Sequence, residues 1–414
     1  MDRRVFLKSS GLALVSFGAL PGVFVRAASA SEGARRKKAL VVVFQRGACD
    51  GLNTVVPFGE SAYRTLRPSI AVAAPGASTA SARDLDGFFG LHPALDPLLP
   101  LWKDGSLGVV HAIGSPDATR SHFDAQDFME SGTPGRKATE DGWMNRALAA
   151  HPSAEATPFR AVSLTPTLPR SLAGRAPAVA LADLRGFEVR RAAGSGVAKG
   201  FEEMYAGAVN QTLADTGRET FDAVQFLKES EAIKQATAEG VSYPRGKYGD
   251  ALRQIAQLLK SDVGLEMAFA ETSGWDHHAA EGGAQGQIAQ RHREFGGALA
   301  AFHRDMGDRM SDIVVVTMTE FGRTVRENGN RGTDHGHASV SLVMGGPVHG
   351  GKVHGRWPGL APGALYEGRD LAVTTDFRDL LAELLTRHLG ATDLKPVFPG
   401  FEVSSDRFPG VIRA

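Results

Sequence analysis

Five runs of apolar residues divide the chain after residue 38. The first run, residues 39–44 (ALVVVF), has no polar position, and this pattern is typical of a parallel strand that is buried on both faces. Four later runs resemble it, so we predict strands there as well: residues 107–113, 265–270, 313–319 and 340–344.

The segments between these runs carry apolar residues at helical spacing. The spacing predicts helices over residues 96–103, 121–130, 143–150, 248–260, 287–309 and 376–389. Strands that alternate with such helices predict an α/β domain, in which a doubly wound, mostly parallel central sheet has helices on both faces. We expect this domain to span residues 36–412, with a helical insertion at residues 183–262, where a long stretch lacks any strand-like run.

Residues 1–30 are typical of an export signal. Arg3 and Arg4 precede an apolar stretch at residues 11–25, and residues 28–30 (ASA) form a small-residue cleavage pattern. The paired arginines resemble the twin-arginine signal, so we expect the twin-arginine export machinery to carry the folded chain to the periplasm or beyond. The apolar stretch of about 15 residues is shorter than the roughly 20 that span a bilayer. We therefore expect a cleaved signal and no membrane contact afterwards, with an uncut signal anchor as the alternative.

The composition restricts the chemistry by which an ion could be bound. The 414 residues include 46 Lys and Arg and 46 Asp and Glu, so the formal net charge is zero and does not indicate a nucleic-acid partner. Cys49 is the single cysteine, which excludes an intrachain disulfide and a multi-cysteine metal site. Any ion must therefore be bound by histidine, aspartate and glutamate side chains.

Acidic and histidine residues gather next to the predicted strands. They follow the first, third and fourth strands or precede the fifth: Asp50, Asp276, His278, Glu320, Asp334 and His335. Because ligands of open parallel sheets bind outside the carboxyl ends of the strands, we expect these residues to converge. Carboxylates that share a cleft repel each other unless a cation lies between them, so we predict that this set binds metal. The alternatives are hydrogen-bonded loop residues and, at Asp50, a simple tight turn.

Ser121 precedes the helix that is predicted after the second strand. The spacing of Ser121 and Asp124 matches a capping box, so the hydroxyl is expected to cap this helix. A hydroxyl at a helix N-terminus beside a metal is also where an activated nucleophile would be stabilised. We therefore predict Ser121 as a candidate nucleophile and Arg120 and Arg323 as residues that bind the oxygens of a phosphate or sulfate group, with exposed surface charge as the alternative for the arginines.

Several segments that occur in one order resemble a known bacterial family. They are residues 49–57 (CDGLNTVVP), 120–123 (RSHF), 319–324 (TEFGRT), 332–335 (GTDH) and 373–378 (VTTDFR). Together with the twin-arginine leader, they resemble the family called domain of unknown function 1501, which is similar to the alkaline phosphatase and sulfatase superfamily. The resemblance implies an alkaline phosphatase-like sheet with a two-metal site at its carboxyl edge.

The resemblance also implies roles for individual residues. Ser121 lies where the nucleophile of the superfamily would be, and the residues that resemble its metal ligands are Asp50, Asp276, His278, Asp334 and His335. The sulfatase signature, a Cys or Ser followed by x-P-x-R, is absent around Ser121, which argues against a typical sulfatase.

These observations favour an exported, metal-dependent hydrolase of phosphate or related esters. A divalent ion, with zinc or manganese favoured and magnesium or calcium as alternatives, would be bound by the mixed histidine and carboxylate set. Ser121 or a metal-activated water would attack a small-molecule or polymer ester. The alternative is a non-catalytic periplasmic protein that binds a polymer or a partner and holds a purely structural ion.

Overall fold

The structure is a computed structural model, and it describes residues 14–16, 37–76, 78–137, 139–152, 157, 159–184 and 235–413. Most of the predicted leader and residues 185–234 of the predicted helical insertion lie outside these ranges. Within the described ranges, none of the helices combines the length and the apolar character that a membrane crossing requires.

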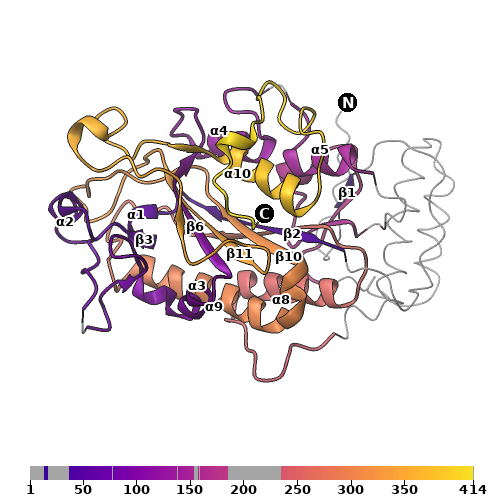
Figure 1. Cartoon of the computed structure of the whole chain (residues 1–414), viewed down its shortest axis with the longest axis horizontal. Helices are drawn as coiled ribbons and strands as arrows, with labels where there is room; N and C mark the ends of the chain where they lie inside the picture. The colour runs from indigo at the N-terminus through magenta and orange to yellow at the C-terminus, as the bar shows by residue number, and fades with distance from the viewer. Residues whose placement is uncertain are drawn as a thin grey trace, which may run out of the picture.

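A mixed sheet of ten described strands crosses the molecule (Figure 1). In spatial order its strands are β1 (Leu14–Ser16), β8 (Ala178–Ala180), β7 (Ala161–Ser163), β9 (Met267–Ser273), β2 (Ala39–Arg46), β10 (Ile313–Met318), β11 (Ser339–Gly345), β6 (Leu107–Gly114) and β12 (Val353–His354), and β13 (Thr375–Asp376) pairs with the end of β6. The five predicted strands are confirmed as β2, β6, β9, β10 and β11. The others have two or three residues each, too few for a hydrophobic pattern to identify them.

The direction of one strand decides which loops meet. Strands β9, β2 and β10 are parallel, with Val42 opposite Phe269 on one side and Val316 on the other. Strand β11 is antiparallel to both β10 and β6. Its N-terminal end therefore lies at the same edge as the carboxyl ends of its neighbours, and the loop that precedes it joins the loops that follow them.

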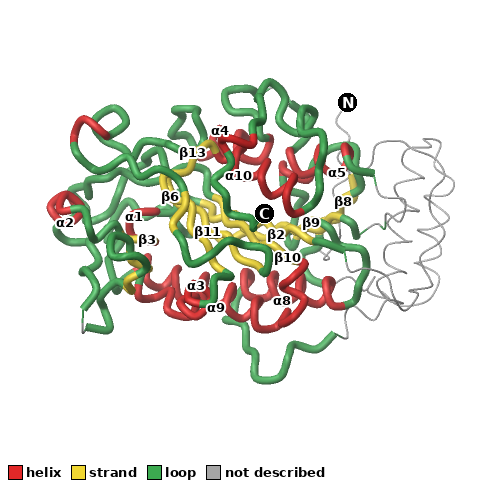
Figure 2. The backbone as a smooth tube through the Cα atoms, in the orientation of Figure 1, coloured by secondary structure: helices red, strands yellow, loops and turns green. Residues whose placement is uncertain are grey.

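Helices cover both faces of the sheet, which confirms the predicted doubly wound architecture (Figure 2). One face packs against α3 (Leu99–Lys103), α8 (Lys247–Lys260) and α9 (Gln287–Met306), and the other against α4 (His122–Ser131), α5 (Trp143–Ala150) and α10 (Phe377–Glu383). Alternate residues of β2 serve the two cores: Val41 and Val43 face the first layer, and Leu40 and Val42 face the second. Burial on both faces is the reason that this strand has no polar alternation.

The six predicted helices are confirmed, with changes at their ends. The segment before α3 is a 3-10 helix (Pro93–Leu98), because its prolines cannot donate to an α-helical ladder. Helix α9 ends at Met306, because the next residue, Gly307, has a φ of +50°, which suits glycine. A 3-10 helix follows (Gly307–Asp312). Helix α10 continues as a π-helix (Leu384–His388).

Smaller elements lie beside the sheet. After β2 come α1 (Gly51–Thr54), β3 (Val55–Val56) and α2 (Ser61–Leu66), and β3 pairs through β5 (Gly90–Leu91) with β4 (Arg83–Asp84). Three short 3-10 helices complete the described elements (Arg170–Leu172, Pro362–Ala364 and Ser405–Arg407). Of the predicted insertion, α8 is described, and it packs against α9 and β9 as part of a helical layer of the domain.

Candidate metal centre

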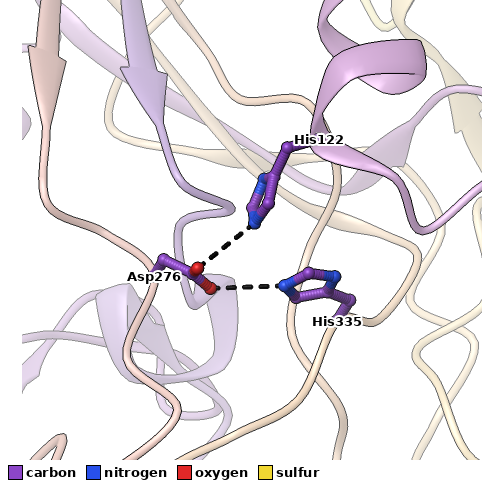
Figure 3. A group of neighbouring side chains, drawn as sticks. All are labelled: His122, Asp276 and His335. Atoms are coloured by element: carbon purple, nitrogen blue, oxygen red, sulfur yellow. Dashed lines mark hydrogen bonds and ion pairs between the residues drawn. The ribbon is translucent and has the colours of Figure 1, made fainter.

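Three side chains from distant parts of the chain meet at the carboxyl edge of the sheet (Figure 3). His122 is the first residue of α4, Asp276 follows β9, and His335 lies in the loop that leads into β11. One ligand atom from each lies within 4.8 Å of the other two. The Nε2 of His122 is 3.4 Å from Asp276 Oδ2, and the Nε2 of His335 is 3.3 Å from Asp276 Oδ1. We call these three residues the metal group, since two imidazoles and a carboxylate are a common ligand set for divalent ions.

Contacts on the far side of each imidazole orient it toward the middle of the metal group. His122 Nδ1 lies 2.8 Å from Glu320 Oε1, and His335 Nδ1 lies 2.7 Å from the carbonyl oxygen of Arg120. Because both partners accept, each Nδ1 donates, and in the neutral imidazole each Nε2 carries a lone pair that faces the middle of the metal group. Among the described residues, the buried Nε2 of His122 has no hydrogen-bond partner. A metal-binding histidine is held in this way, so the metal group fits a divalent cation.

Glu320 lies behind His122 and is fully buried. Its Oε1 also accepts from Gly47 N–H at 2.8 Å and from Gln126 Nε2 at 2.9 Å. Burial alone would raise the pKa of Glu320, but the hydrogen bonds from His122 and Gln126 hold that pKa below its ordinary value. In turn, the hydrogen bond to Glu320 raises the pKa of His122. Glu320 therefore acts on the metal group through His122. It forms no hydrogen bond or ion pair with Asp276 or His335.

Gly47 allows the end of β2 to pass directly against the segment that carries Asp276. Its φ is +115°, and a Cβ at this position would lie 2.8 Å from the backbone nitrogen of Asp276. A side chain there would be strained and would collide with backbone. The glycine thus lets the same short segment support Glu320 through its N–H and approach Asp276.

Arg323 holds the carboxylate of Asp276. Its Nη1 is 2.7 Å from Asp276 Oδ1, and its guanidinium is fully buried. Its Nε donates to Thr333 Oγ1 at 3.1 Å, and its Nη2 donates to the Thr333 carbonyl. Burial would raise the pKa of Asp276, but Arg323 and the neighbouring histidines lower it. The side chain of Arg323 is therefore engaged with Asp276, whereas the sequence predicted that it binds substrate oxygens.

His278 and Asp334 border the metal group on its exposed side. His278 Nε2 lies 3.0 Å from Asp276 Oδ1 and 3.0 Å from His335 Nε2. Its Nδ1 lies 3.3 Å from Asp334 Oδ1, which also accepts from Asn328 Nδ2 at 3.1 Å. The structure thus brings together four of the six predicted ligands, Asp276, His278, Asp334 and His335, and places Glu320 directly behind His122.

Asp50 is the predicted ligand that the structure does not bring into this arrangement. Its carboxylate is buried and forms an ion pair with the guanidinium of Arg67. Its Oδ1 accepts from Leu52 N–H at 3.1 Å, so Asp50 also caps α1. Burial would raise the pKa of Asp50, but Arg67 holds it below its ordinary value. The backbone at Asp50 thus forms a local turn, which was the alternative interpretation of the sequence. The charge of Asp50 is neutralised by Arg67, which follows the end of α2.

Ser121 and Arg120 stand next to the metal group but have other contacts. Ser121 is the N-cap of α4, and its Oγ lies 3.5 Å from Asp124 N–H, as the capping pattern predicts. The Nη2 of Arg120 lies 2.7 Å from Asp370 and 2.6 Å from Glu367. The guanidinium of Arg120 is thus paired with two carboxylates, and its carbonyl orients a histidine of the metal group.

The sequence interpretation missed His122. This histidine lies inside the capping pattern that drew attention to Ser121, and it follows the end of a predicted strand by nine residues. The available signal was its place at the start of a helix after that strand, because the first side chain of such a helix is at the sheet edge where ligands bind.

One of three comparisons with known proteins identifies a family. A family model described as "Protein of unknown function (DUF1501)" matches residues 102–398. Among curated proteins, none matches the sequence. Two solved structures are similar at 11% identity and a TM-score of 0.40 each. One is the C-terminal periplasmic domain of EcEptC from Escherichia coli in complex with zinc, where the match covers 90% of this chain and 89% of that one. The other is the PsFucS1 sulfatase from Pseudoalteromonas sp., where it covers 92% and 74%. A TM-score of this size is too low to say anything about the site of this chain.

Proposed function

The chain belongs to the DUF1501 family, and we propose that it is a metal-dependent hydrolase of phosphate or related esters. The observation that carries this proposal is the orientation of His122 and His335, whose far nitrogens are held by Glu320 and by a backbone carbonyl so that their near nitrogens converge on Asp276. Such anchoring is expected of metal ligands.

The metal group is open to solvent, which favours a catalytic over a structural ion. The side chains of His122 and His335 are 24% and 23% exposed, and that of Asp276 is 41% exposed. Structural zinc sites are closed by four protein ligands, whereas catalytic sites have three and keep a position for a reacting group. Two imidazoles and one carboxylate suit zinc or manganese.

A divalent ion at this position would act as a Lewis acid on an ester oxygen and would stabilise the negative charge that develops there. The residues of the chain have complementary tasks. Asp276 supplies the negative charge that attracts the cation, and Arg323 keeps its carboxylate in place. Ser121 is the nearest hydroxyl in sequence to a member of the metal group, and we retain it as the candidate nucleophile.

The N-terminal segment extends the proposal to the location of the protein. Arg3, Arg4 and the apolar stretch that follows them support export by the twin-arginine machinery, which accepts folded proteins. Mass spectrometry of the protein recovered from the cell envelope tests whether the signal is cleaved: a chain that begins near residue 31 supports cleavage, and an intact leader favours the uncut signal anchor.

A second candidate function is a non-catalytic binding protein with a structural ion. The contacts of two arginines favour it, because Arg120 is paired with Asp370 and Glu367 and Arg323 with Asp276. Neither guanidinium is free to bind the two oxygens of a transferred phosphate or sulfate group. In this alternative the same residues hold the ion, and no ester is turned over.

Two measurements on one set of proteins separate the candidates. Metal content is determined on protein purified without chelators, and turnover is measured on phosphate monoesters, phosphate diesters and sulfate esters. Asp276→Asn should lose both metal and turnover, whereas Asp250→Asn, a surface change on α8, should lose neither. Bound metal without turnover of any ester favours the binding protein. Absence of bound metal from the parent chain contradicts both candidates. If Ser121→Ala is fully active while Asp276→Asn is inactive, Ser121 is not the attacking group.

A further inference from the structure

A pair of buried carboxyl groups lies behind the metal group. Asp50 follows β2, and Glu281 lies in the segment between β9 and α9. Both are at most 1% exposed, and each influences the pKa of the other. The ligand chemistry described above uses neither residue. We call Asp50 and Glu281 the carboxyl pair.

The carboxyl pair holds one negative charge. Two ionised carboxylates in the same buried region repel each other, so one of the two groups keeps its proton. Among the described residues, none provides a donor to Glu281 Oε1. Asp50 is ionised because Arg67 pairs with it, and burial beside this charge raises the pKa of Glu281 well above its ordinary value. Glu281 is therefore the neutral acid of the pair.

The other oxygen of Glu281 leads to the metal group through two side chains. Thr333 Oγ1 donates to Glu281 Oε2 at 2.9 Å and accepts from Arg323 Nε at 3.1 Å. Arg323 Nη1 then donates to Asp276 Oδ1 at 2.7 Å. Glu281, Thr333 and the guanidinium of Arg323 are all fully buried. The guanidinium of Arg323 can only donate, so the Thr333 hydroxyl must accept from it and donate its own hydrogen to Glu281. The position of Asp276 therefore depends on the acceptor oxygen of Glu281.

We propose that Glu281 is a positioning residue of the metal group, which acts on the carboxylate of Asp276 through Thr333 and Arg323. The inference rests on the metal site of the proposed function. Glu281 fixes the direction of the Thr333 hydroxyl, and the Thr333 oxygen then fixes the plane of the Arg323 guanidinium. Because Glu281 is neutral, it performs this task without adding a negative charge that would compete with Asp276 for Arg323.

Substitutions of Thr333 test the link, with zinc ions alone as the probe. Zinc affinity of the full chain is measured by competition with a chromophoric chelator. Thr333→Val keeps the shape of the side chain but removes the hydroxyl, and we expect zinc affinity to fall about 10-fold, as for other losses of outer contacts to metal ligands. Thr333→Ser restores the hydroxyl and should restore the affinity to within about twofold of the parent.

Thr317→Val is the matched control for a merely structural effect. Thr317 is also a buried threonine with a hydrogen-bonded hydroxyl, which accepts from Leu342 N–H at 2.9 Å inside the sheet. This variant should lower the melting temperature without changing zinc affinity. If Thr333→Val and Thr317→Val both leave zinc affinity at the parent value, the inference is wrong and the proposed function stands. If the parent chain itself binds no divalent ion, the proposed function and the inference both fail.

Glu281→Gln tests the neutral state of the acid. An amide has the shape of a protonated carboxyl group and carries no charge, and its oxygen can accept from Thr333. We therefore expect Glu281→Gln to bind zinc within about twofold of the parent, and Glu281→Met, which offers Thr333 no such acceptor, to bind about 10-fold more weakly. Weak binding by Glu281→Gln together with normal binding by Glu281→Met would overturn the proposal.

Discussion

Replacement of Glu320 by glutamine isolates the charge that orients His122. Glu320 Oε1 accepts from Gly47 N–H, Gln126 and His122 at distances of at most 2.9 Å. The glutamine oxygen can accept from the same three donors, and its amide can donate to the Thr319 hydroxyl, which lies 3.1 Å from Oε2. We therefore expect E320Q to fold with its hydrogen bonds retained and one negative charge removed.

The expected effect on metal binding follows from the strength of the bond to His122. A hydrogen bond to an ionised acceptor is roughly twice as strong as a neutral one, and loss of a carboxylate behind a metal-binding histidine typically costs about 10- to 100-fold in affinity. We expect a loss of this size for zinc at pH 8, measured by chelator competition. Glu383→Gln is the matched control, because Glu383 is equally buried but accepts from Arg387 and from the backbone of residues 410 and 412. It should leave zinc affinity unchanged.

The metal-free chain supplies a second measurement with a defined pH window. The contact between His122 and Glu320 raises the pKa of His122 above 6.5 and lowers that of Glu320 below 4.5. Its contribution to stability is therefore fully present between pH 4.5 and 6.5. It is lost as the pH rises through the raised pKa of His122 or falls through the lowered pKa of Glu320. At pH 6 we expect E320Q to lose about 1.5 kcal/mol of the free energy of unfolding, the lower end for charged hydrogen bonds, because solvent screens the partly exposed His122.

The two measurements together can refute the reasoning. At pH 9 the difference in the free energy of unfolding between the parent and E320Q should be smaller than at pH 6. Zinc affinity equal to that of the parent at pH 8, combined with an unchanged free energy of unfolding at pH 6 in urea, would show that Glu320 does not orient His122.

Other contacts of the site and its surroundings make further outcomes measurable. Arg67→Met leaves Asp50 buried without its partner and should cost about 3–5 kcal/mol in urea denaturation; a loss below about 1 kcal/mol, typical of a surface pair, would contradict the ion pair. The contribution of Asp50, whose pKa is lowered, is present above pH 3.8 and should disappear as the pH falls through that lowered pKa. Ser121→Ala should cost about 1 kcal/mol, and Ser121→Asn only a few tenths, because asparagine also caps helices; equal losses would exclude the cap. Addition of a chelator to metal-loaded protein should lower the melting temperature of the parent and leave that of His335→Ala unchanged, and equal shifts would exclude His335 as a ligand.

Much of the architecture could be predicted because burial constrains sequence directly. Strand β2 is covered on both faces, so its core positions admit no polar residue, and the helices of the two layers keep their apolar residues at the spacing of the buried face. The cap at Ser121 was equally predictable, since its partner is three residues away. The clustering of Asp276, His278, Asp334 and His335 followed from the rule that ligands gather at the carboxyl edge of a sheet.

The sequence by itself thus determined the layers, the strands long enough to show a pattern, and most of the residues that border the site. Only the tertiary structure decided that β11 runs antiparallel, which brings His335 to the edge where Asp276 lies. Only the tertiary structure decided that Asp50 forms an ion pair with Arg67 and that His122 is hydrogen-bonded to Glu320. The physical reason is that periodicity and capping depend on neighbours along the chain, whereas a charged side chain takes as its partner whichever group the packing places within a few ångströms.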